Sequence, residues 1–476
     1  MGKISSRTPR ASGSWKSLAN QPSFNASTML LLTDGTVMCH EENTTHWWRL
    51  SPDAYGDYAN GTWTALSSMR DARLYFASAV LSDGRVFVAG GEYSGGSVPV
   101  DLNSAEIYDP TSDLWSVIPV PGWAQIGDAP CCVLPDGKVL LGSIMSTQTS
   151  IYDPVTNTWK SAATKDDSSS EETWTLLRDG SVFSAECTNH PQCEKFLTPE
   201  LRWVPAAALP AGQDLVEASS IEIGPAVLLP IGDLFAVGAT GKTGIYTSGF
   251  ANNQPGTWRA GPTFPRNAMN QQLGAKDAPA CLLPSGEVLC AVGPVTGNAN
   301  DFLPPTSFYL FDGINLNQIN SPPNSSGPPF EGRMLLVPSG QVLFANGSND
   351  IEVYTPHGSP DPEWAAIITS CPTTLQRGSS HRLSGIRLNG WSQAVSYGDD
   401  ATAATNYPIV RLTDTATGLV SYCRTFNHSS MGVQTRADKI VSTNVSVPPS
   451  AITGPVELRV IANGIESLPQ QVTVLP

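Results

Sequence analysis

The sequence is poor in charge, and most of the charge that it has is acidic. Only 14% of the 476 residues are Asp, Glu, Lys or Arg, against about 25% in an average globular chain. The 27 basic residues are outnumbered by 42 acidic ones, which gives a net charge of −15. So few charges argue against long charged helices and coiled coils. Nucleic acid is excluded as a partner, because neutralising phosphates requires a basic face.

Several targeting and cofactor signals are also missing. No apolar run approaches the roughly 18 residues that span a membrane, and the polar residues 1–14 lack the apolar centre of a signal peptide. We therefore expect a soluble chain with no membrane partner, either cytoplasmic or extracellular with its signal absent from this sequence. No phosphate-binding loop predicts a nucleotide cofactor, and no Cys/His cluster has zinc spacing.

The cysteines leave one structural question open. There are nine, so at least one is outside any intramolecular disulfide. Cys187 and Cys193 enclose five residues and could close a loop disulfide in an oxidising compartment.

Glycine and proline, by contrast, are plentiful, and the glycines mark a repeat. Seven times an apolar stretch, a Gly-containing turn and a second apolar stretch follow one another, as in Val80-Leu-Ser-Asp-Gly-Arg-Val86. Each copy indicates a hairpin, and most continue to a Tyr-Asp-Pro-like phrase and then a Trp. The turn glycines are Gly35, Gly84, Gly137, Gly180, Gly232, Gly286 and Gly340. Four strands per unit, repeated about every 50 residues, predict a seven-bladed kelch-type β-propeller.

The seventh unit lacks its last strand, and the missing strand stands at the other end of the chain. The unit stops at Tyr354-Thr-Pro, whereas Gly13-Ser-Trp-Lys-Ser-Leu18 has the Trp pattern of a fourth strand. We expect residues 13–18 to close the ring, since closure removes an exposed sheet edge. The propeller is thus expected to occupy residues 1–361.

From residue 362 a different β pattern begins. Short strand patterns, among them 383–388, 394–397, 408–413 and 421–426, follow one another at sandwich spacing. They predict an immunoglobulin-like β-sandwich over residues 362–476. The whole chain is expected to be all-β and monomeric.

The second unit carries the sharpest motif, Arg73-Leu-Tyr75-Phe-Ala-Ser-Ala-Val-Leu-Ser-Asp-Gly-Arg-Val-Phe-Val-Ala-Gly-Gly91. Together with the domain order, it resembles the galactose oxidase and glyoxal oxidase family of copper radical oxidases, over nearly the whole chain. In that family this blade supplies the tyrosine that is linked to a cysteine and serves as radical cofactor and copper ligand. The resemblance places that role at Tyr75, and it places Tyr93 where galactose oxidase has a Trp stacked on the linked pair.

Other parts of the family pattern differ. The linking cysteine should stand where this chain has Asn25-Ala26, and the family's Tyr-His ligand pair should stand at Phe330-Glu331. The last family ligand, a His followed six residues later by Gln, matches His428 and Gln434. Cu(II) favours imidazole and phenolate donors, and only Tyr75 and His428 remain. We therefore expect no standard copper radical chemistry, with a divergent copper oxidase as an alternative.

Acidic residues stand where the inner strands begin. The position nine residues before the turn glycine is acidic in four units, at Asp128, Glu171, Asp277 and Glu331, and in the fifth unit Glu222 stands one place earlier. Inner strands line a propeller's axis, so these side chains should gather at one channel mouth. Arg73, Tyr93 and Asn25 are the residues expected to contact a ligand there.

Three interpretations of this mouth remain open. It could be a hydrated polar entrance without chemistry, or a site for a hard divalent cation such as Ca²⁺ held by the four acids and His428, with Cu less favoured. It could also be a catalytic pocket in which Glu331 or Asp277 acts as acid or base, beside Tyr75 and His428. The corresponding functions are an enzyme acting on a small polar or carbohydrate-like molecule, or a non-catalytic kelch module that binds a glycan or a protein.

Overall fold

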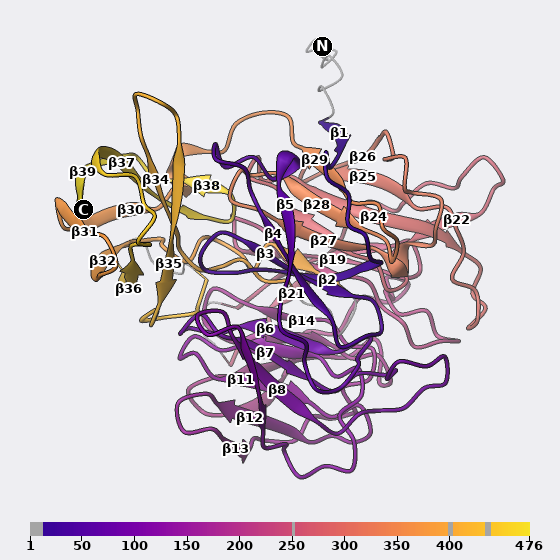
Figure 1. The fold of residues 1–476 in the computed structure, drawn as a ribbon. Helices are drawn as coiled ribbons and strands as arrows, with labels where there is room; N and C mark the ends of the chain where they lie inside the picture. Colours follow the sequence, from indigo (N-terminus) through magenta and orange to yellow (C-terminus); the bar gives the residue numbers. More distant parts are fainter. Residues whose placement is uncertain (1–12, 250–252, 398–402, 434–438) are drawn as a thin grey trace.

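The computed structural model describes residues 13–249, 253–397, 403–433 and 439–476. They form β-strands and three short 3-10 turns, η1 (Tyr58–Asn60), η2 (Pro329–Glu331) and η3 (Pro362–Trp364). No helix among them is long and apolar enough to span a membrane. The all-β propeller followed by a C-terminal β domain, predicted from the repeats, is confirmed (Figure 1).

Seven four-stranded antiparallel blades build the propeller. Blade 1 consists of β2 (Ala26–Leu31), β3 (Val37–Glu41), β4 (Trp47–Ser51) and β5 (Thr62–Ala65). Blade 2 consists of β6 (Ala77–Val80), β7 (Val86–Ala89), β8 (Ala105–Asp109) and β9 (Leu114–Ile118). Blade 3 consists of β10 (Cys131–Val133), β11 (Val139–Gly142), β12 (Thr149–Asp153) and β13 (Thr158–Ser161). Blades 4 and 5 consist of β14 (Trp174–Leu176), β15 (Val182–Ala185), β16 (Cys193–Leu197), β17 (Arg202–Ala206); and β18 (Ala226–Leu228), β19 (Asp233–Val237), β20 (Thr243–Thr247), β21 (Thr257–Ala260). Blade 6 consists of β23 (Ala280–Leu282), β24 (Val288–Val295), β25 (Ser307–Phe311) and β26 (Leu316–Ile319), and the short strand β22 (Gln272–Gly274) pairs with β24. Blade 7 consists of β27 (Arg333–Leu336), β28 (Val342–Ala345), β29 (Glu352–Thr355) and β1 (Ser14–Ser17).

The repeated glycines lie in the turns between the first two strands of each blade. All seven have a positive φ, between 77° and 98°. A side chain is disfavoured in this left-handed region, whereas glycine adopts it readily. The turn chemistry therefore explains the regular spacing of the repeat.

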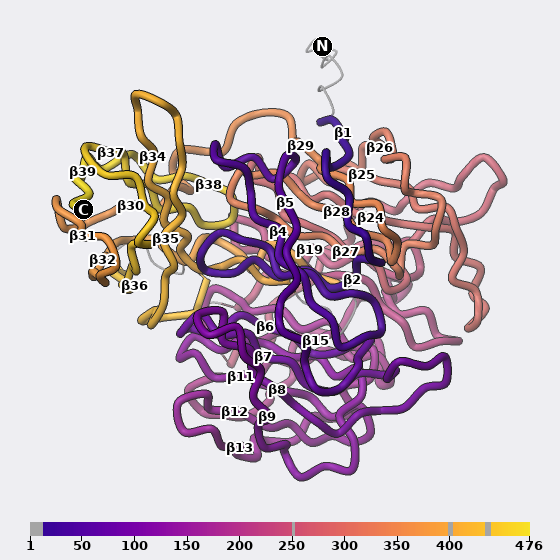
Figure 2. Tube along the Cα trace, viewed as in Figure 1, coloured from indigo at the N-terminus to yellow at the C-terminus, as the bar shows by residue number. Residues whose placement is uncertain are grey.

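Strand β1 closes the ring by joining blade 7. It pairs antiparallel with β29, so that Trp15 stands opposite Tyr354. The Trp15 ring also packs against Phe308, with ring centroids 4.9 Å apart, and its Nε1 donates to Asn320 O at 2.8 Å. The first and last strands of the propeller are thus held in one sheet (Figure 2).

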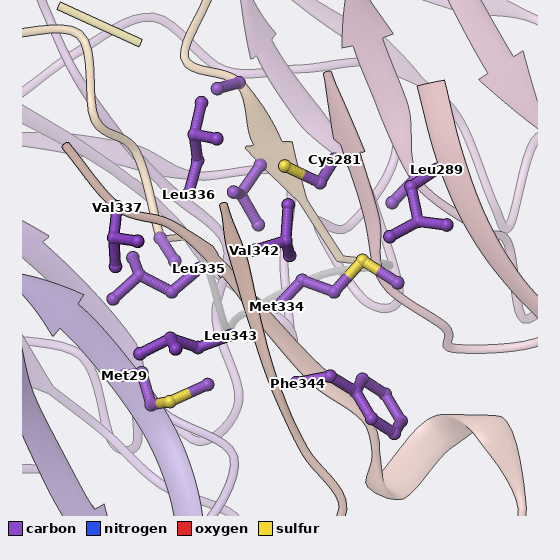
Figure 3. Close-up of a cluster of buried hydrophobic side chains, with 14 of the residues drawn as sticks. Met29, Cys281, Leu289, Met334, Leu335, Leu336, Val337, Val342, Leu343 and Phe344 are labelled. Carbon is purple, nitrogen blue, oxygen red and sulfur yellow. The ribbon is translucent and has the colours of Figure 1, made fainter. Parts of the chain in front are cut away.

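Apolar side chains of neighbouring blades fill the spaces between the sheets. Met29 of β2, Cys281 of β23 and Met334 of β27 are all buried in one cluster, and Figure 3 shows them with Leu343 and Phe344. This packing fixes the inner strands relative to one another.

The C-terminal domain is a curled sheet around its own core, on one side of the propeller in Figure 1. Its core includes Leu383, Val410, Cys423 and Val460. Its strands are β30 (Ile367–Ser370), β31 (Thr374–Gln376), β32 (Ser380–Ile386), β34 (Ile409–Thr413), β35 (Val420–Phe426), β36 (Ile440–Ser446), β37 (Gly454–Ala462), β38 (Ile465–Glu466) and β39 (Gln470–Leu475).

One strand predicted for this domain pairs with a propeller blade and not with the sheet of its own domain. Residues 394–397 contain β33 (Val395–Ser396), which pairs antiparallel with β23 of blade 6. The segment around it, which we call the axial segment (residues 391–397 and 403–407), also contacts other inner strands. Gln393 Oε1 accepts from Leu176 N in blade 4 at 2.8 Å, and Ala226 N in blade 5 donates to Ser396 Oγ at 3.1 Å. The C-terminal domain therefore reaches into the propeller axis.

The body of the C-terminal domain rests on the turn end of the propeller. Backbone hydrogen bonds join Thr425 N to Thr33 O, His428 N to Ser82 O and Met431 N to Pro135 O. These acceptors lie in or beside the first turns of blades 1, 2 and 3, opposite the ends where the inner strands begin. The predicted channel mouth lies at the other end of the propeller, where the inner strands begin.

Candidate functional site

Three of the positions where inner strands begin share an uncommon backbone conformation. Tyr75, Glu171 and Asp277, each nine residues before its turn glycine, have φ of 50°, 60° and 45°. Left-handed backbone costs a non-glycine residue about 1 kcal/mol or more, because Cβ approaches a carbonyl oxygen. Such strain persists where the surrounding structure fixes it, and it is concentrated at functional sites. The surrounding structure, and not the conformational preference of these residues, therefore fixes their backbone at the mouth.

Glu171, Glu222 and Asp277, from blades 4, 5 and 6, form a carboxylate triad. One carboxylate oxygen from each lies within 4.8 Å of the other two. Asp277 and Glu222 share a side-chain hydrogen bond, and burial raises the pKa of Asp277 well above its usual range. The negative charges of Glu222 and Asp128 raise that pKa further. Both the burial and the neighbouring carboxylates therefore favour the protonated form of Asp277 over its charged form.

A second group of acids lies on the blade 7 and blade 1 side. Burial raises the pKa of Glu331, and it raises that of Glu42, in the loop after β3, where the charge of Glu331 adds to the effect. The guanidinium of Arg333, the first residue of β27, lowers the pKa of both carboxyls and also that of Asp277. Arg333 is therefore the cation that acts on both acidic groups.

Arg333 is held between aromatic rings. It is 5% exposed, and its Cζ lies 4.1 Å from the ring centroid of Tyr397 and 5.6 Å from that of Tyr75. Its Nη1 donates to Phe330 O and Gly332 O, both at 2.8 Å. Tyr75 in turn meets Tyr93 edge to face, with centroids 6.1 Å apart.

The predicted mouth residues are thus largely brought together. Asp128 is close enough to raise the pKa of both Asp277 and Tyr93, although burial is the larger cause in each. Asn25 is exposed, and its carbonyl oxygen accepts from Glu42 N at 2.9 Å. Asn25 therefore lies beside the second acidic group.

Two predicted site residues lie elsewhere, and the first is His428. Its backbone N bonds to Ser82 O in the turn after β6, whereas Tyr75 precedes β6. Seven residues of strand separate the two by about 20 Å. The predicted convergence of His428 with Tyr75 is therefore wrong, and Gln434, which supported the match, lies outside the described residues.

The second is Arg73, which is a structural residue. Its side chain is fully buried, and its Nη2 lies 3.0 Å from Glu106 Oε1 and 3.6 Å from Asp71. It also donates to the carbonyl oxygens of Gly90 and Ser104. Arg73 thus holds the loops of blade 2, and the prediction that it contacts a ligand is wrong.

The loop between Cys187 and Cys193 contains free thiols. All nine cysteines are free, and eight are buried. The thiol of Cys187 donates to Glu171 O at 3.0 Å, so it helps to hold the strained backbone of the triad residue.

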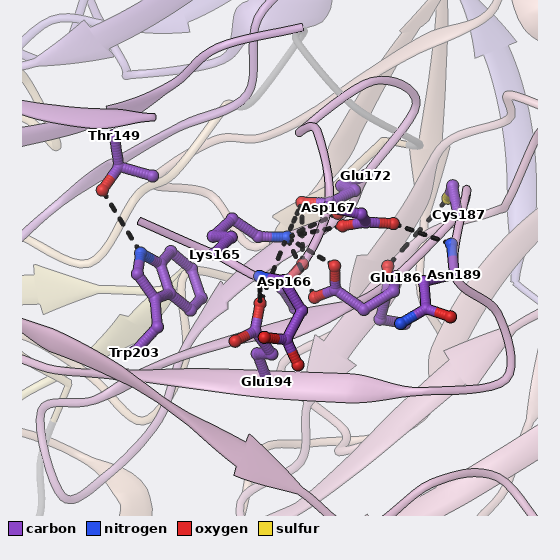
Figure 4. Close-up of polar contacts among 12 residues, drawn as sticks. Thr149, Lys165, Asp166, Asp167, Glu172, Glu186, Cys187, Asn189, Glu194 and Trp203 are labelled. Atoms are coloured by element: carbon purple, nitrogen blue, oxygen red, sulfur yellow. Dashed lines mark hydrogen bonds and ion pairs between the residues drawn. The ribbon is translucent and has the colours of Figure 1, made fainter. Parts of the chain in front are cut away.

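A further group of acids, separate from the two groups at the mouth, is buried in blade 4 around Lys165 (Figure 4). Lys165 Nζ lies 2.5 Å from Glu172 and 2.9 Å from Glu186, and 3.5 Å from Asp167. Burial raises the pKa of Glu172 to about 7 in spite of Lys165. Because the ammonium group already stands among the carboxylates, this cluster is an internal ion network that ties the chain after β13 to blade 4.

Sequence reasoning missed Arg333, Tyr397, Glu42 and the Lys165 network. Arg333 stands two residues after Glu331, so the repeat register could have found it. Tyr397 could not be placed, because its position depends on how the C-terminal domain enters the axis.

Comparison with known proteins agrees with this architecture. Residues 73–119 match the Kelch motif family. A 63-residue segment, 13% of this chain, is 41% identical to galactose oxidase of Gibberella zeae, and a segment of the same length is 43% identical to an F-box/kelch-repeat protein of Arabidopsis thaliana. These segments span only 9% and 17% of the two relatives.

Solved structures extend the likeness to the whole fold. A fungal alcohol oxidase of the AA5 family, in complex with copper, is similar over 98% of this chain and 100% of its own, with a TM-score of 0.57 and 16% identity. A virginiamycin B lyase of Staphylococcus aureus is similar over 72% of this chain and 99% of its own, with a TM-score of 0.52 and 12% identity. The chain carries a kelch motif and the galactose-oxidase-like propeller fold.

Proposed function

We propose that this protein binds a small polar, carbohydrate-like molecule at the axial mouth and acts on it by acid–base chemistry. The observation that carries the proposal is the carboxylate triad, in which Asp277 and Glu222 share a side-chain hydrogen bond and burial raises the pKa of Asp277 well above its usual range. Neighbouring acids whose environments push their pKa values apart can divide the roles of proton donor and acceptor. Asp277 is the proposed acid and Glu222 the proposed base.

Other residues of the mouth fit a polar ligand. Asp277 Oδ1 is buried and has no hydrogen-bond partner among the described residues, so it is available to a ligand hydroxyl. Tyr75 and Tyr93 offer ring faces, which suit the apolar faces of sugars, and their hydroxyl groups can hydrogen-bond. Glu331 and Asn25 would contact the ligand from the side of blades 7 and 1.

The residues present do not fit the copper site of the related oxidases. That site needs imidazole donors and a linked cysteine, whereas the corresponding positions hold Asn25-Ala26 and Phe330-Glu331. His428 lies with the turn of blade 2. The Arg333 guanidinium and the Tyr93 ring lie beside Tyr75 instead, and no step of the proposed chemistry uses copper.

Peroxide formation tests the exclusion of copper chemistry. The protein is incubated with Cu(II) and assayed with galactose, methylglyoxal and primary alcohols. We expect no peroxide above the level of a Tyr75→Phe variant. Turnover that depends on both Cu(II) and Tyr75 would overturn this part of the proposal.

Ligand binding tests the acid–base pair. Saturation-transfer NMR with galactose, glucose and N-acetylglucosamine should detect binding to the wild-type protein, weakened at least tenfold in Asp277→Asn and Glu222→Gln. Glu200→Gln, a change at an exposed acid, serves as the control. If no sugar binds, or if the two variants bind as the wild type does, the proposed site is wrong.

The triad geometry favours one second candidate function, a site for a hard divalent cation. Three carboxylate oxygens within 4.8 Å of one another resemble part of an oxygen-ligand shell. Calorimetric titration with Ca²⁺ and Mn²⁺ distinguishes the two ideas. Binding that disappears in Glu222→Gln would support the cation site.

A further inference from the structure

Arg333 provides a positive charge at the mouth, and its guanidinium contacts a residue of the C-terminal domain. The guanidinium lies 4.1 Å from the ring centroid of Tyr397, closer than the 5.6 Å to Tyr75. Tyr397 directly follows β33, so it comes from the axial segment and not from a blade. The cation of the mouth and the ring that contacts it therefore come from different domains.

Tyr397 is itself fixed at several points. Its hydroxyl donates to Phe330 O at 2.5 Å, the same carbonyl oxygen that accepts from Arg333 Nη1 at 2.8 Å. Its own carbonyl oxygen accepts from Thr173 Oγ1 at 3.2 Å, in blade 4. A small cavity at this point is lined by Arg333 and Tyr397 together with Thr28 and Pro279. The ring is thus anchored to blades 4 and 7 while it covers the guanidinium.

We infer that Tyr397 is a positioning residue of the axial site, which holds the Arg333 guanidinium over Tyr75 and between the two acidic groups. A guanidinium that is stacked on a ring and bonded to fixed carbonyl oxygens has few alternative orientations. The described acids of the mouth come from the blades. By fixing Arg333, the C-terminal domain therefore affects how much of their negative charge is compensated. The use of this mouth for a ligand rests on the proposed function, whereas the placement of Arg333 does not.

The charge of Glu331 reports the position of Arg333 without any ligand. Among the described residues, Glu331 faces Arg333 on β27 and Glu42 on the loop after β3. Arg333 lowers the pKa of Glu331, so a guanidinium that moves away must raise it. The side-chain carboxyl carbons of ¹³C-labelled Glu residues can be titrated by NMR, and the signal missing in Glu331→Gln assigns the group.

The test compares single and double variants. Arg333→Gln should raise the titration midpoint of Glu331 by about half a pH unit or more. Tyr397→Leu, which keeps an apolar side chain but removes the ring and the hydroxyl, should raise it in the same direction. In Tyr397→Phe, which keeps the ring, the titration midpoint of Glu331 should stay close to the wild-type value. In the Arg333→Gln background, Tyr397→Leu should add nothing, because the two residues act through one guanidinium.

Two results would overturn the inference. One is an unchanged Glu331 midpoint in folded Tyr397→Leu. The other is a shift of the same size with and without Arg333, which would indicate a general change in packing. If Tyr397→Leu does not fold, Arg333→Lys provides the comparison. An ammonium group lacks the planar face that stacks on the ring, so we expect a raised Glu331 midpoint in this variant, and an unchanged midpoint would overturn the inference. Absence of sugar binding leaves these outcomes unaffected.

Discussion

At the residue scale, His428 shows how burial turns a family match into a structural role. Its Nδ1 bonds to Thr443 Oγ1 at 2.9 Å, its ring stacks on Tyr407 with centroids 6.2 Å apart, and its Nε2 has no hydrogen-bond partner among the described residues. Burial and, to a smaller extent, the charge of Arg424 lower the pKa of His428 to about 3. The imidazole is therefore neutral in the folded protein at any pH near neutrality.

This lowered pKa makes folding sensitive to acid. In the unfolded chain His428 takes up a proton near its usual pKa of about 6.5, whereas the folded protein does not until about pH 3. The unfolded state thus gains protons as the pH falls between these values, and stability is lost at about 1.4 kcal/mol per pH unit. Between pH 7 and pH 5 we expect the wild type to lose about 2 kcal/mol more than His428→Gln.

Urea denaturation at pH 7 and pH 5 measures this difference. His357→Gln, which removes an exposed imidazole, is the matched control. Equal losses for wild type and His428→Gln would show that the imidazole is not buried in its neutral form.

At the element scale, β1 is the strand on which ring closure depends. Trp15 fills a space between Phe308 and Tyr354 and donates to Asn320 O. Trp15 is half-buried, and Trp15→Ala removes these contacts, so we expect a loss of about 2 kcal/mol. A chain that starts at Gln21 should lose more, because β29 then becomes an exposed edge.

Thermal unfolding followed by circular dichroism measures both changes. Lys16→Ala, on the exposed side of the same strand, should have little effect. A melting temperature that is unchanged in Trp15→Ala or in the shortened chain would contradict closure by β1.

The blades and the closing strand could be predicted from the sequence because their signals are local. A turn glycine at φ of 84°, as at Gly84, restricts its own position to few residue types, and a Trp-containing strand pattern is recognisable wherever it stands. The candidate site was only partly predictable. Asp277 and Glu171 follow the repeat register, but Tyr397 and His428 belong to the C-terminal domain, and which of them reaches the axis depends on long-range packing.

At the scale of the whole molecule, the axial segment couples the C-terminal domain to the propeller. β33 adds to the inner strand of blade 6, Tyr407 Oη donates to Leu31 O in blade 1 at 2.5 Å, and Gln393 bonds to Leu176 in blade 4. The segment thus joins the inner strands of blades 1, 4 and 6 by hydrogen bonds. Neither domain can leave the other without breaking contacts in several blades.

We therefore expect the full chain to unfold in a single transition. Differential scanning calorimetry should give a calorimetric enthalpy equal to the van't Hoff enthalpy, as required for two-state behaviour. Gln393→Ala and Ser396→Ala, which each remove a hydrogen bond of about 1 kcal/mol between the segment and a blade, should lower the temperature of that transition without splitting it. Val155→Ala, at a side chain that is 91% exposed, should leave the temperature unchanged. Two resolved transitions, with only one of them shifted by Gln393→Ala, would show that the propeller and the C-terminal domain fold independently, because an axial segment shared by both must couple their unfolding.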